Sequence, residues 1–138
     1  VALSVVPFDL RAKDYRKLKP DAWEAKTIDA AAKALYGIKE PIETDKISIT
    51  IPEMNSSGAK VPIKIETTLD AKTVALFQDA NPESAVAVFD VTPYDMKTYG
   101  VKIKMAGDGM VMVLVEANDG NIYMAKATTK VAAGGCEG

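Results

Sequence analysis

The chain has 138 residues, of which 48% are hydrophobic and 26% are charged, and these values are typical of one globular domain with its own core. Its formal charge of −2 and the lack of a basic cluster argue against a nucleic-acid-binding surface. One cysteine and no histidine exclude an internal disulfide framework and a thiolate zinc site, and they remove the residues on which most hydrolytic sites depend. The longest apolar run, residues 110–115, is too short to span a bilayer, and the first residues show no export-signal pattern, so we expect no membrane attachment.

The N-terminal part of the chain is expected to be helical. Asp21 precedes Glu24 by three residues, which resembles a capping box with the aspartate as the cap. The apolar residues that follow fall at helical spacing and predict one buried face: Ile28, Ala31, Ala32 and Leu35. Gly37 stands where a glycine commonly ends a helix, and a shorter helix with a weaker pattern is expected over residues 12–18. We predict that Trp23 anchors the helical segment on the rest of the protein.

After Pro41 the hydrophobic period changes to two residues, which is typical of strands with one buried face. Seven segments have strand character: residues 47–51, 61–67, 73–78, 85–92, 101–105, 110–117 and 122–131. Residues 52–58 are expected to form a loop, and the turns at residues 107–109 and 118–121 favour tight hairpins, because their Asp-Gly pairs supply a positive φ. A helical segment followed by about seven short strands predicts an all-β sandwich.

The only cysteine, Cys136, lies among glycines near the C-terminus. Its neighbours are Gly134, Gly135, Glu137 and Gly138. Because glycine removes side-chain bulk, the sequence predicts a domain of residues 1–131 followed by a flexible arm of residues 132–138, which reaches about 17 Å from residue 131 to the thiol. A thiol reacts as its thiolate, and an ordinary cysteine is ionised to a few per cent at neutral pH. Two interpretations remain here: a handle that carries a covalently attached group, and a cysteine without function at a disordered terminus.

Other candidate groups are better explained by structural roles. Four methionines in strand segments are of the type that binds copper(I): Met105, Met110, Met112 and Met124. Glu40 and Glu43 resemble an acid–base pair, and residues 118–119 resemble calcium ligands. Methionine far more often fills cores, and carboxylates at turns and helix ends far more often cap backbone groups. We therefore predict no metal site and no bound cofactor.

Several segments together resemble one known family. They are Val-Lys-Ile-Lys-Met-Ala at residues 101–106, Asn-Asp-Gly-Asn-Ile-Tyr at residues 118–123, Lys130-Val131, and the Gly-Gly-Cys of the C-terminus. Upstream, Ile-Pro-Glu-Met at residues 51–54 and Gly-Ala-Lys-Val-Pro at residues 58–62 fit the same pattern. From residue 38 onward the chain resembles SoxY, the sulfur-carrier subunit of the bacterial Sox system of thiosulfate oxidation. The terminal glycine–cysteine arm is the most specific part of this resemblance.

The resemblance implies an immunoglobulin-like sandwich in the periplasm that works as a heterodimer with the subunit SoxZ. It implies that Cys136 forms a covalent conjugate with thiosulfate, which other Sox enzymes oxidise and hydrolyse while the carrier holds it. These partners would be a haem enzyme that attaches the sulfur, a manganese hydrolase that releases sulfate and, in some organisms, a sulfane dehydrogenase. The carrier itself would not turn over substrate and would hold no cofactor besides the sulfur species on Cys136.

Glu137 departs from the family arm, which usually reads Gly-Gly-Cys-Gly-Gly. Its carboxylate follows the thiol directly in the sequence, and negative charge nearby disfavours both a thiolate and an anionic adduct. We therefore expect Glu137 to lower the reactivity of Cys136. A second function class stays open: an immunoglobulin-like interaction domain, not an enzyme, whose terminal cysteine forms an intermolecular disulfide.

Overall fold

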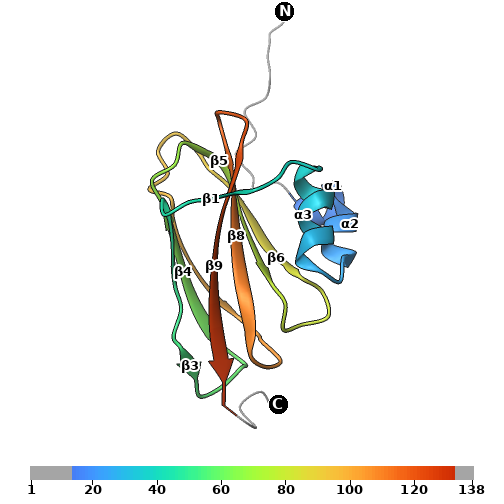
Figure 1. The fold of residues 1–138 in the computed structure, drawn as a ribbon, viewed down its shortest axis with the longest axis vertical. Coiled ribbons are helices and arrows are strands. Elements are labelled where there is room, and N and C mark those ends of the chain that lie inside the picture. Colours follow the sequence, from blue (N-terminus) through green and yellow to red (C-terminus); the bar gives the residue numbers. More distant parts are fainter. Residues whose placement is uncertain (1–13, 133–138) are drawn as a thin grey trace, which may run out of the picture.

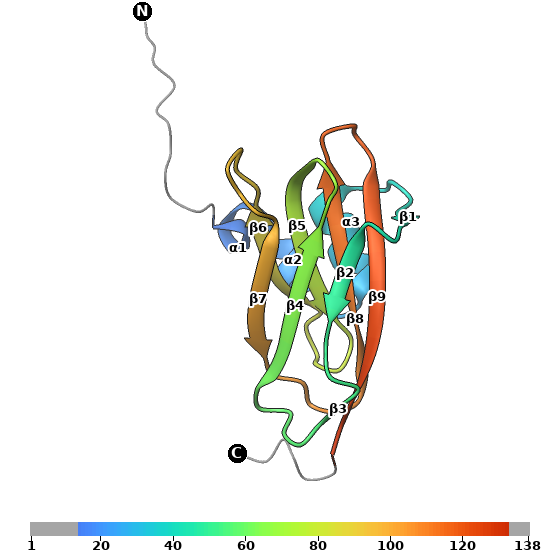
Figure 2. The ribbon, with the colours of Figure 1, turned by 90° about the vertical axis from the view of Figure 1, so that its left-hand side faces the viewer.

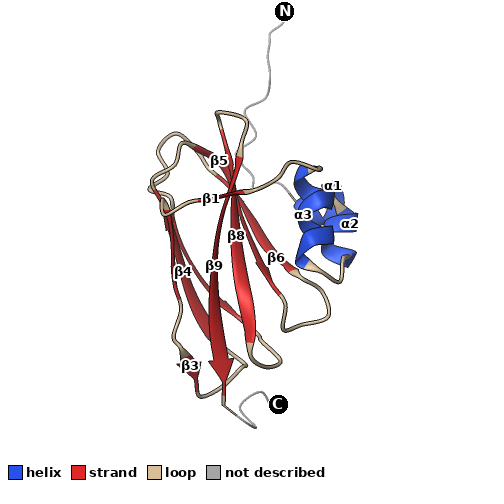
Figure 3. Ribbon diagram, in the orientation of Figure 1, coloured by secondary structure: helices blue, strands red, loops and turns tan. Residues whose placement is uncertain are grey.

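The computed structural model describes residues 14–132, which form three layers (Figure 1). Two β-sheets face each other, and short helices cover the outer face of the larger sheet, so that all helices lie on one side of the molecule (Figure 3). The helices are α1 (Tyr15–Leu18), α2 (Pro20–Glu24) and α3 (Ile28–Tyr36). The strands are β1 (Ile42–Glu43), β2 (Ile47–Thr50), β3 (Met54–Asn55), β4 (Val61–Thr67), β5 (Ala71–Gln78), β6 (Ala85–Asp90), β7 (Thr98–Ile103), β8 (Gly109–Ala117) and β9 (Ile122–Val131).

The two sheets form the β-sandwich that the sequence predicted, with the helical segment before it. The larger sheet has the strand order β1-β9-β8-β5-β6, and β3 pairs with β9 outside this path. Its long strands are antiparallel, whereas the two-residue strands β1 and β3 run parallel to β9. The smaller sheet has the order β2-β4-β7 and is antiparallel throughout.

The main core lies between the sheets. In β4 every second residue is buried, from Val61 to Thr67, and the residues between them face solvent, which is the origin of the two-residue period in the sequence. The core residues that face β4 from the larger sheet come from β5 and β8: Val74, Leu76, Val111, Val113 and Val115. Each such side chain contributes about 1.5–3 kcal/mol when it leaves water.

A second core lies between the larger sheet and the helices. The sheet contributes Ala75, Phe77, Leu114 and Ile122, and the helices contribute Ala22, Ile28, Ala31 and Leu35. Trp23 and Ala32 pack against the same cluster while staying partly exposed, so the predicted anchoring role of Trp23 is confirmed. Because β5 and β8 are covered on both faces, they read as nearly continuous apolar runs instead of alternating ones.

The prediction of one helix capped by Asp21 is wrong. The segment forms two helices, and Asp21 lies inside α2, which begins at Pro20 without a side-chain cap. Thr27 caps α3, because its Oγ1 accepts a hydrogen bond from the Ala30 N–H at 3.1 Å. Gly37 ends α3 with φ = +83°, as predicted. The shorter helix expected over residues 12–18 is present in part as α1, since residues 12 and 13 lie outside the described residues.

All seven predicted strands are present, with shifts of a few residues at their ends. The turn at residues 118–121 joins β8 and β9 in a hairpin and places Gly120 at φ = +91°, which confirms that prediction. The hairpin predicted at residues 107–109 is wrong, because β7 pairs only with β4 in the smaller sheet and β8 belongs to the larger one. The segment 52–58, predicted as a loop, contains β3.

Between residues 14 and 132 no helix is long and apolar enough to cross a membrane. The division into a domain of residues 1–131 and an arm of residues 132–138 stays a prediction, because residues 1–13 and 133–138 lie outside the described part of the chain.

Candidate functional site

The predicted attachment residue and most of its arm lie outside the described residues. They are Gly134, Gly135, Cys136, Glu137 and Gly138. The last described residue, Ala132, directly follows β9 and precedes Cys136 by four positions. The structure therefore shows the site up to its base, which is the end of β9 (Figure 1).

The end of β9 is paired with β3, which lies beside it in parallel. Met54 lies opposite Lys130, and Asn55 lies opposite Val131. The Lys130 N–H donates to the Glu53 carbonyl, and the Ala132 N–H donates to the Asn55 carbonyl, both at 2.9 Å. Backbone hydrogen bonds thus hold the chain up to Ala132.

Asn55 also holds β9 through its side chain, which is only 6% exposed. Its Nδ2 donates to Thr129 Oγ1 at 2.7 Å and to the Lys130 carbonyl at 3.2 Å. Thr129 is buried as well, and its hydroxyl donates to the Pro52 carbonyl at 2.5 Å. A buried hydrogen-bonded chain therefore joins the segment before β4 to the last strand, which satisfies groups that are costly to bury alone.

A carboxylate provides a further contact to β9. Asp108 Oδ1 accepts a hydrogen bond from the Val131 N–H at 2.8 Å. Next to it, Gly109 has no room for a side chain, because an added Cβ would lie 2.8 Å from Asp79 Oδ1. We call Pro52, Asn55, Asp108 and Thr129 the β9 anchor. Sequence reasoning missed all four, and their spacing in the sequence carries no signal of the contact.

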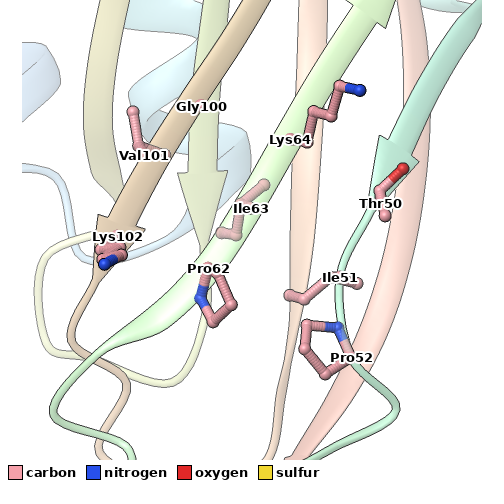
Figure 4. Close-up of a pocket in the computed structure, with 9 residues that line it drawn as sticks. All are labelled: Thr50, Ile51, Pro52, Pro62, Ile63, Lys64, Gly100, Val101 and Lys102. Atoms are coloured by element: carbon pink, nitrogen blue, oxygen red, sulfur yellow. The ribbon is translucent and has the colours of Figure 1, made fainter.

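A groove lies on the outer face of the smaller sheet, next to the β9 anchor. It has a volume of about 790 Å³, and its lining comes from the end of β2, from β4 and from β7 (Figure 4): Thr50, Ile51, Pro52, Pro62, Ile63, Lys64, Gly100, Val101 and Lys102. Pro52 belongs to both the groove and the anchor. Lys64 lies 3.7 Å from the carboxylate of Glu66 in an exposed ion pair. The groove offers apolar contacts and two lysines, and its lining residues include no acid–base pair.

The four methionines considered as copper ligands do not gather in one place. Met105 is fully buried in the core between the sheets. Met110, Met112 and Met124 pack in the other core, beneath the helices. The larger sheet separates these two cores, so the methionines act as filling on its opposite faces.

Polar side chains also connect the helices to the larger sheet. Tyr15 donates to Asp90 Oδ1 at 2.5 Å, and Tyr36 and Thr73 share a hydrogen bond of 2.6 Å. Since Thr73 Oγ1 donates to Glu116 at 3.1 Å, the Tyr36 hydroxyl is the donor to Thr73. Burial raises the pKa of both tyrosines, and the hydrogen bond to Asp90 raises the pKa of Tyr15 further. Both phenols stay neutral at physiological pH, which fits a role in packing the helices.

The carboxylates considered as catalytic or calcium groups lie on the surface, in strand β1, in the loop before it and in the turn between β8 and β9. Glu40 and Glu43 are exposed. Asp119 accepts hydrogen bonds from the Tyr123 hydroxyl at 2.7 Å and from the Asn121 N–H at 2.8 Å, and these bonds lower the pKa of Asp119. Across the described residues, no group of three or more His, Cys, Asp or Glu side chains is arranged to hold a metal ion.

Known proteins resemble the chain over most of its length. The family described as "Sulfur oxidation protein SoxY" matches residues 32–136. A solved structure of the sulfur carrier protein SoxY from Chlorobium limicola f thiosulfatophilum has 32% sequence identity and a TM-score of 0.71, and the match covers 80% of this chain and 96% of that one. No curated protein sequence matches the chain.

Two more distant structures share the fold. A superoxide reductase (neelaredoxin) from Ignicoccus hospitalis has 12% identity and a TM-score of 0.57, covering 63% of this chain and 80% of that chain. A hypothetical protein from Pyrococcus horikoshii OT3 has 11% identity and a TM-score of 0.51, covering 64% and 89%. At such identities the likeness shows the architecture alone.

Proposed function

The chain belongs to the SoxY family of sulfur oxidation proteins, and we propose that it carries sulfur intermediates of thiosulfate oxidation on Cys136. One observation supports this most directly: the family match extends to residue 136, so Cys136 lies within the matched range. The carrier supplies the thiol, and partner enzymes supply the catalysis.

The chemistry of such a carrier balances in two steps. Joining the Cys136 thiol to thiosulfate forms an S–S bond and releases one proton and two electrons, which the haem-containing partner accepts. Water then attacks the terminal sulfonate, and sulfate and a proton leave while a persulfide remains on Cys136. This second step is a hydrolysis that needs neither an oxidant nor a reductant, so it suits a hydrolase.

We propose that residues 132–138 form the swinging arm. Cys136 lies four positions after Ala132, whose N–H is bound to Asn55, and four extended residue steps reach about 14 Å. Gly134, Gly135 and Gly138 would let the arm enter a narrow cleft, while Glu137 adds bulk and charge. The β9 anchor supports the proposal, because it fixes the point from which the arm starts.

The remaining parts of the proposal concern partners and compartment. The chain would form a heterodimer with a SoxZ-like subunit in the periplasm. It would serve the haem-containing enzyme that attaches sulfur, the manganese hydrolase that releases sulfate and, where present, a sulfane dehydrogenase. It would need no cofactor of its own.

Mass spectrometry of the chain from cells growing on thiosulfate tests the proposal. Sulfur-containing adducts are expected on Cys136, and a Cys136→Ser variant is expected to carry none and to stop thiosulfate oxidation. A thiol that stays unmodified during turnover would refute the carrier function. If Cys136→Ser removes a covalent dimer and leaves thiosulfate oxidation intact, the interaction domain with an intermolecular disulfide is the correct alternative.

A further inference from the structure

The groove on the smaller sheet is a gap that β2 leaves beside β4. Strand β2 ends at Thr50, which lies opposite Lys64 of β4. The chain then continues through Pro52 and pairs as β3 with β9, so within the described part of the chain no strand pairs with residues 61–63 on the β2 side. Figure 2 shows this side of the molecule, with β3 beneath the end of β2. The gap therefore follows from where β2 ends.

The middle of β7 keeps the groove open, because Gly100 has no side chain. Gly100 is exposed, lies opposite Lys64 and lines the groove (Figure 4). A Cβ added to Gly100 would meet no atom within 4 Å, and its φ is not positive, so neither packing among the described residues nor its backbone requires glycine. Glycine weakens the interior of a strand, and it often marks a place where a ligand or another backbone segment approaches closely. The groove thus has room for an extended segment.

The side chains around the groove carry positive charge. Lys64 and Lys102 line it, and none of its lining residues is acidic. Lys64 already pairs with Glu66 at 3.7 Å, whereas Lys102 forms no ion pair within residues 14–132. An acidic side chain on a segment of small residues would complement this surface in both charge and shape.

The segment that follows β9 has this composition and starts beside the groove. Residues 133–137 read Ala-Gly-Gly-Cys-Glu, in which Glu137 is the only charged residue. Pro52 borders the groove, and its carbonyl accepts the hydrogen bond from Thr129 of β9. The last described residue, Ala132, is bound to Asn55, three positions after Pro52. The chain therefore leaves the described part of the structure close to the edge of the groove.

The length of this segment fits the distance to Lys102. Glu137 lies five positions after Ala132, and five extended steps reach about 17 Å. Three steps, about 10 Å at most, separate Asn55 from Pro52. The remaining reach of about 7 Å exceeds one strand spacing of about 5 Å, which is the distance from the line of β2 to β4. From there the long side chains of Glu137 and Lys102 span the last spacing to β7.

We propose that the groove is the resting site of residues 133–137 of this chain, with the Glu137 carboxylate paired with Lys102 and the backbone of the segment in the gap beside β4. Docking places Cys136 against the smaller sheet, one position from the ion pair, and away from other molecules. Because an exposed ion pair contributes little energy, the segment leaves the groove at small cost. The inference concerns where the segment rests, and it holds whatever Cys136 carries.

Zero-length cross-linking of the full chain with a carbodiimide tests the ion pair. The reagent activates a carboxylate, and a lysine amine beside it then forms an amide bond that mass spectrometry of the digested chain locates. A cross-link between Lys102 and Glu137 is expected within single chains. A mixture of ¹⁴N and ¹⁵N chains distinguishes it from a cross-link between two copies.

Two leucine variants show whether the groove is responsible. Gly100→Leu fills the groove and keeps both charges, so it should lower the yield of the cross-link about tenfold, the factor that a loss of about 1.4 kcal/mol gives. The matched control is Gly107→Leu, where an added Cβ also meets no atom within 4 Å. Gly107 precedes Asp108, which binds Val131, so this variant adds bulk near the start of the segment but outside the groove. It should leave the yield unchanged.

A nitroxide attached to Cys136, the only cysteine, gives a second readout with every other residue unchanged. The amide signals of Gly100 and Lys102 are expected to broaden more than that of Gly107. The opposite order would overturn the proposal, because the loop of Gly107 is bound to the end of β9 and lies nearer to a segment that does not dock. Equal cross-linking in both leucine variants would also overturn it. So would broadening that grows with the concentration of the chain, since a second copy would then occupy the groove.

Discussion

The side chain of Asn55 is expected to determine how firmly the base of the arm is held. Replacing Asn55 with alanine removes the two hydrogen bonds from Nδ2 to Thr129 Oγ1 and to the Lys130 carbonyl. It leaves the backbone of β3 in place, including the carbonyl that accepts the Ala132 N–H. The substitution therefore separates the side-chain part of the β9 anchor from the backbone part.

The expected loss follows from the number and burial of these bonds. Each intramolecular hydrogen bond contributes about 1 kcal/mol to stability, and Asn55 is 6% exposed, so the free energy of unfolding should fall by about 2 kcal/mol. For a domain of this size that corresponds to a fall of about 8 °C in Tm. If the loss is confined to the strand end, exchange of the Lys130 and Ala132 amides should accelerate about 30-fold, because about 1.4 kcal/mol corresponds to a factor of ten.

Thermal unfolding and amide hydrogen exchange measure the two quantities. The control is Thr128→Ala, an exposed position on the same strand, which should change neither Tm nor exchange at the strand end. If Asn55→Ala leaves the Lys130 and Ala132 amides as slow as before, the side-chain network does not hold β9 and the reasoning fails.

Three further predictions concern other parts of the molecule. Gly109→Ala should lower the free energy of unfolding in urea by about 1–3 kcal/mol, because the new Cβ would lie 2.8 Å from Asp79 Oδ1. It would displace a carboxylate that accepts a hydrogen bond from the Met110 N–H. An unchanged free energy of unfolding would show that the loop relaxes freely. Burial raises the pKa of Tyr36 in the folded chain, so the neutral Tyr36 hydroxyl contributes fully to stability below about pH 10. As the pH rises further, this contribution is lost at about 1.4 kcal/mol per pH unit. Tyr36→Phe should therefore make the free energy of unfolding depend less steeply on alkaline pH. Glu137→Gly should speed the labelling of Cys136 by small thiol reagents at neutral pH, because it removes a negative charge beside the thiolate; equal or slower labelling would contradict this.

The sequence predicted those strands whose burial follows a simple rule. One face of β4 is exposed to solvent and the other is buried, so buried and exposed residues alternate along it. This alternation predicts a strand over residues 61–67, which are the bounds that the structure shows. For β9 the predicted range 122–131 is also the observed one. Strand β5 is buried on both faces, so its residues do not alternate, and the apolar run predicts a strand without fixing where it begins. The strand begins two residues earlier than predicted.

Features that depend on contacts between distant segments were not accessible to the sequence. The Asp-Gly at residues 108–109 looks like a hairpin turn locally, yet it connects the two sheets, and Asp108 binds Val131 instead. Strand β3 has two residues and therefore no period. Its partner, β9, lies more than 70 positions away, with |i−j| = 74 between Asn55 and Thr129. The candidate site divides in the same way: the thiol was found from composition, and the β9 anchor, which holds the end of β9, was not.

If residues 132–138 form the proposed swinging arm, the β9 anchor determines its length, and this connects the fold to the proposed function. With the strand held to Ala132, Cys136 lies four positions beyond the last bound N–H, a reach of about 14 Å. If the anchor were lost as far as Thr129, seven residues would be free and the reach would grow to about 24 Å. A longer arm would enter a deeper cleft, but the effective concentration of the thiol at a partner's active site falls as a linker lengthens beyond the distance it must span. Under the proposed function, a carrier that serves several enzymes gains from a fixed starting point for its arm, and the buried side chains of Asn55 and Thr129 would provide it at the end of β9.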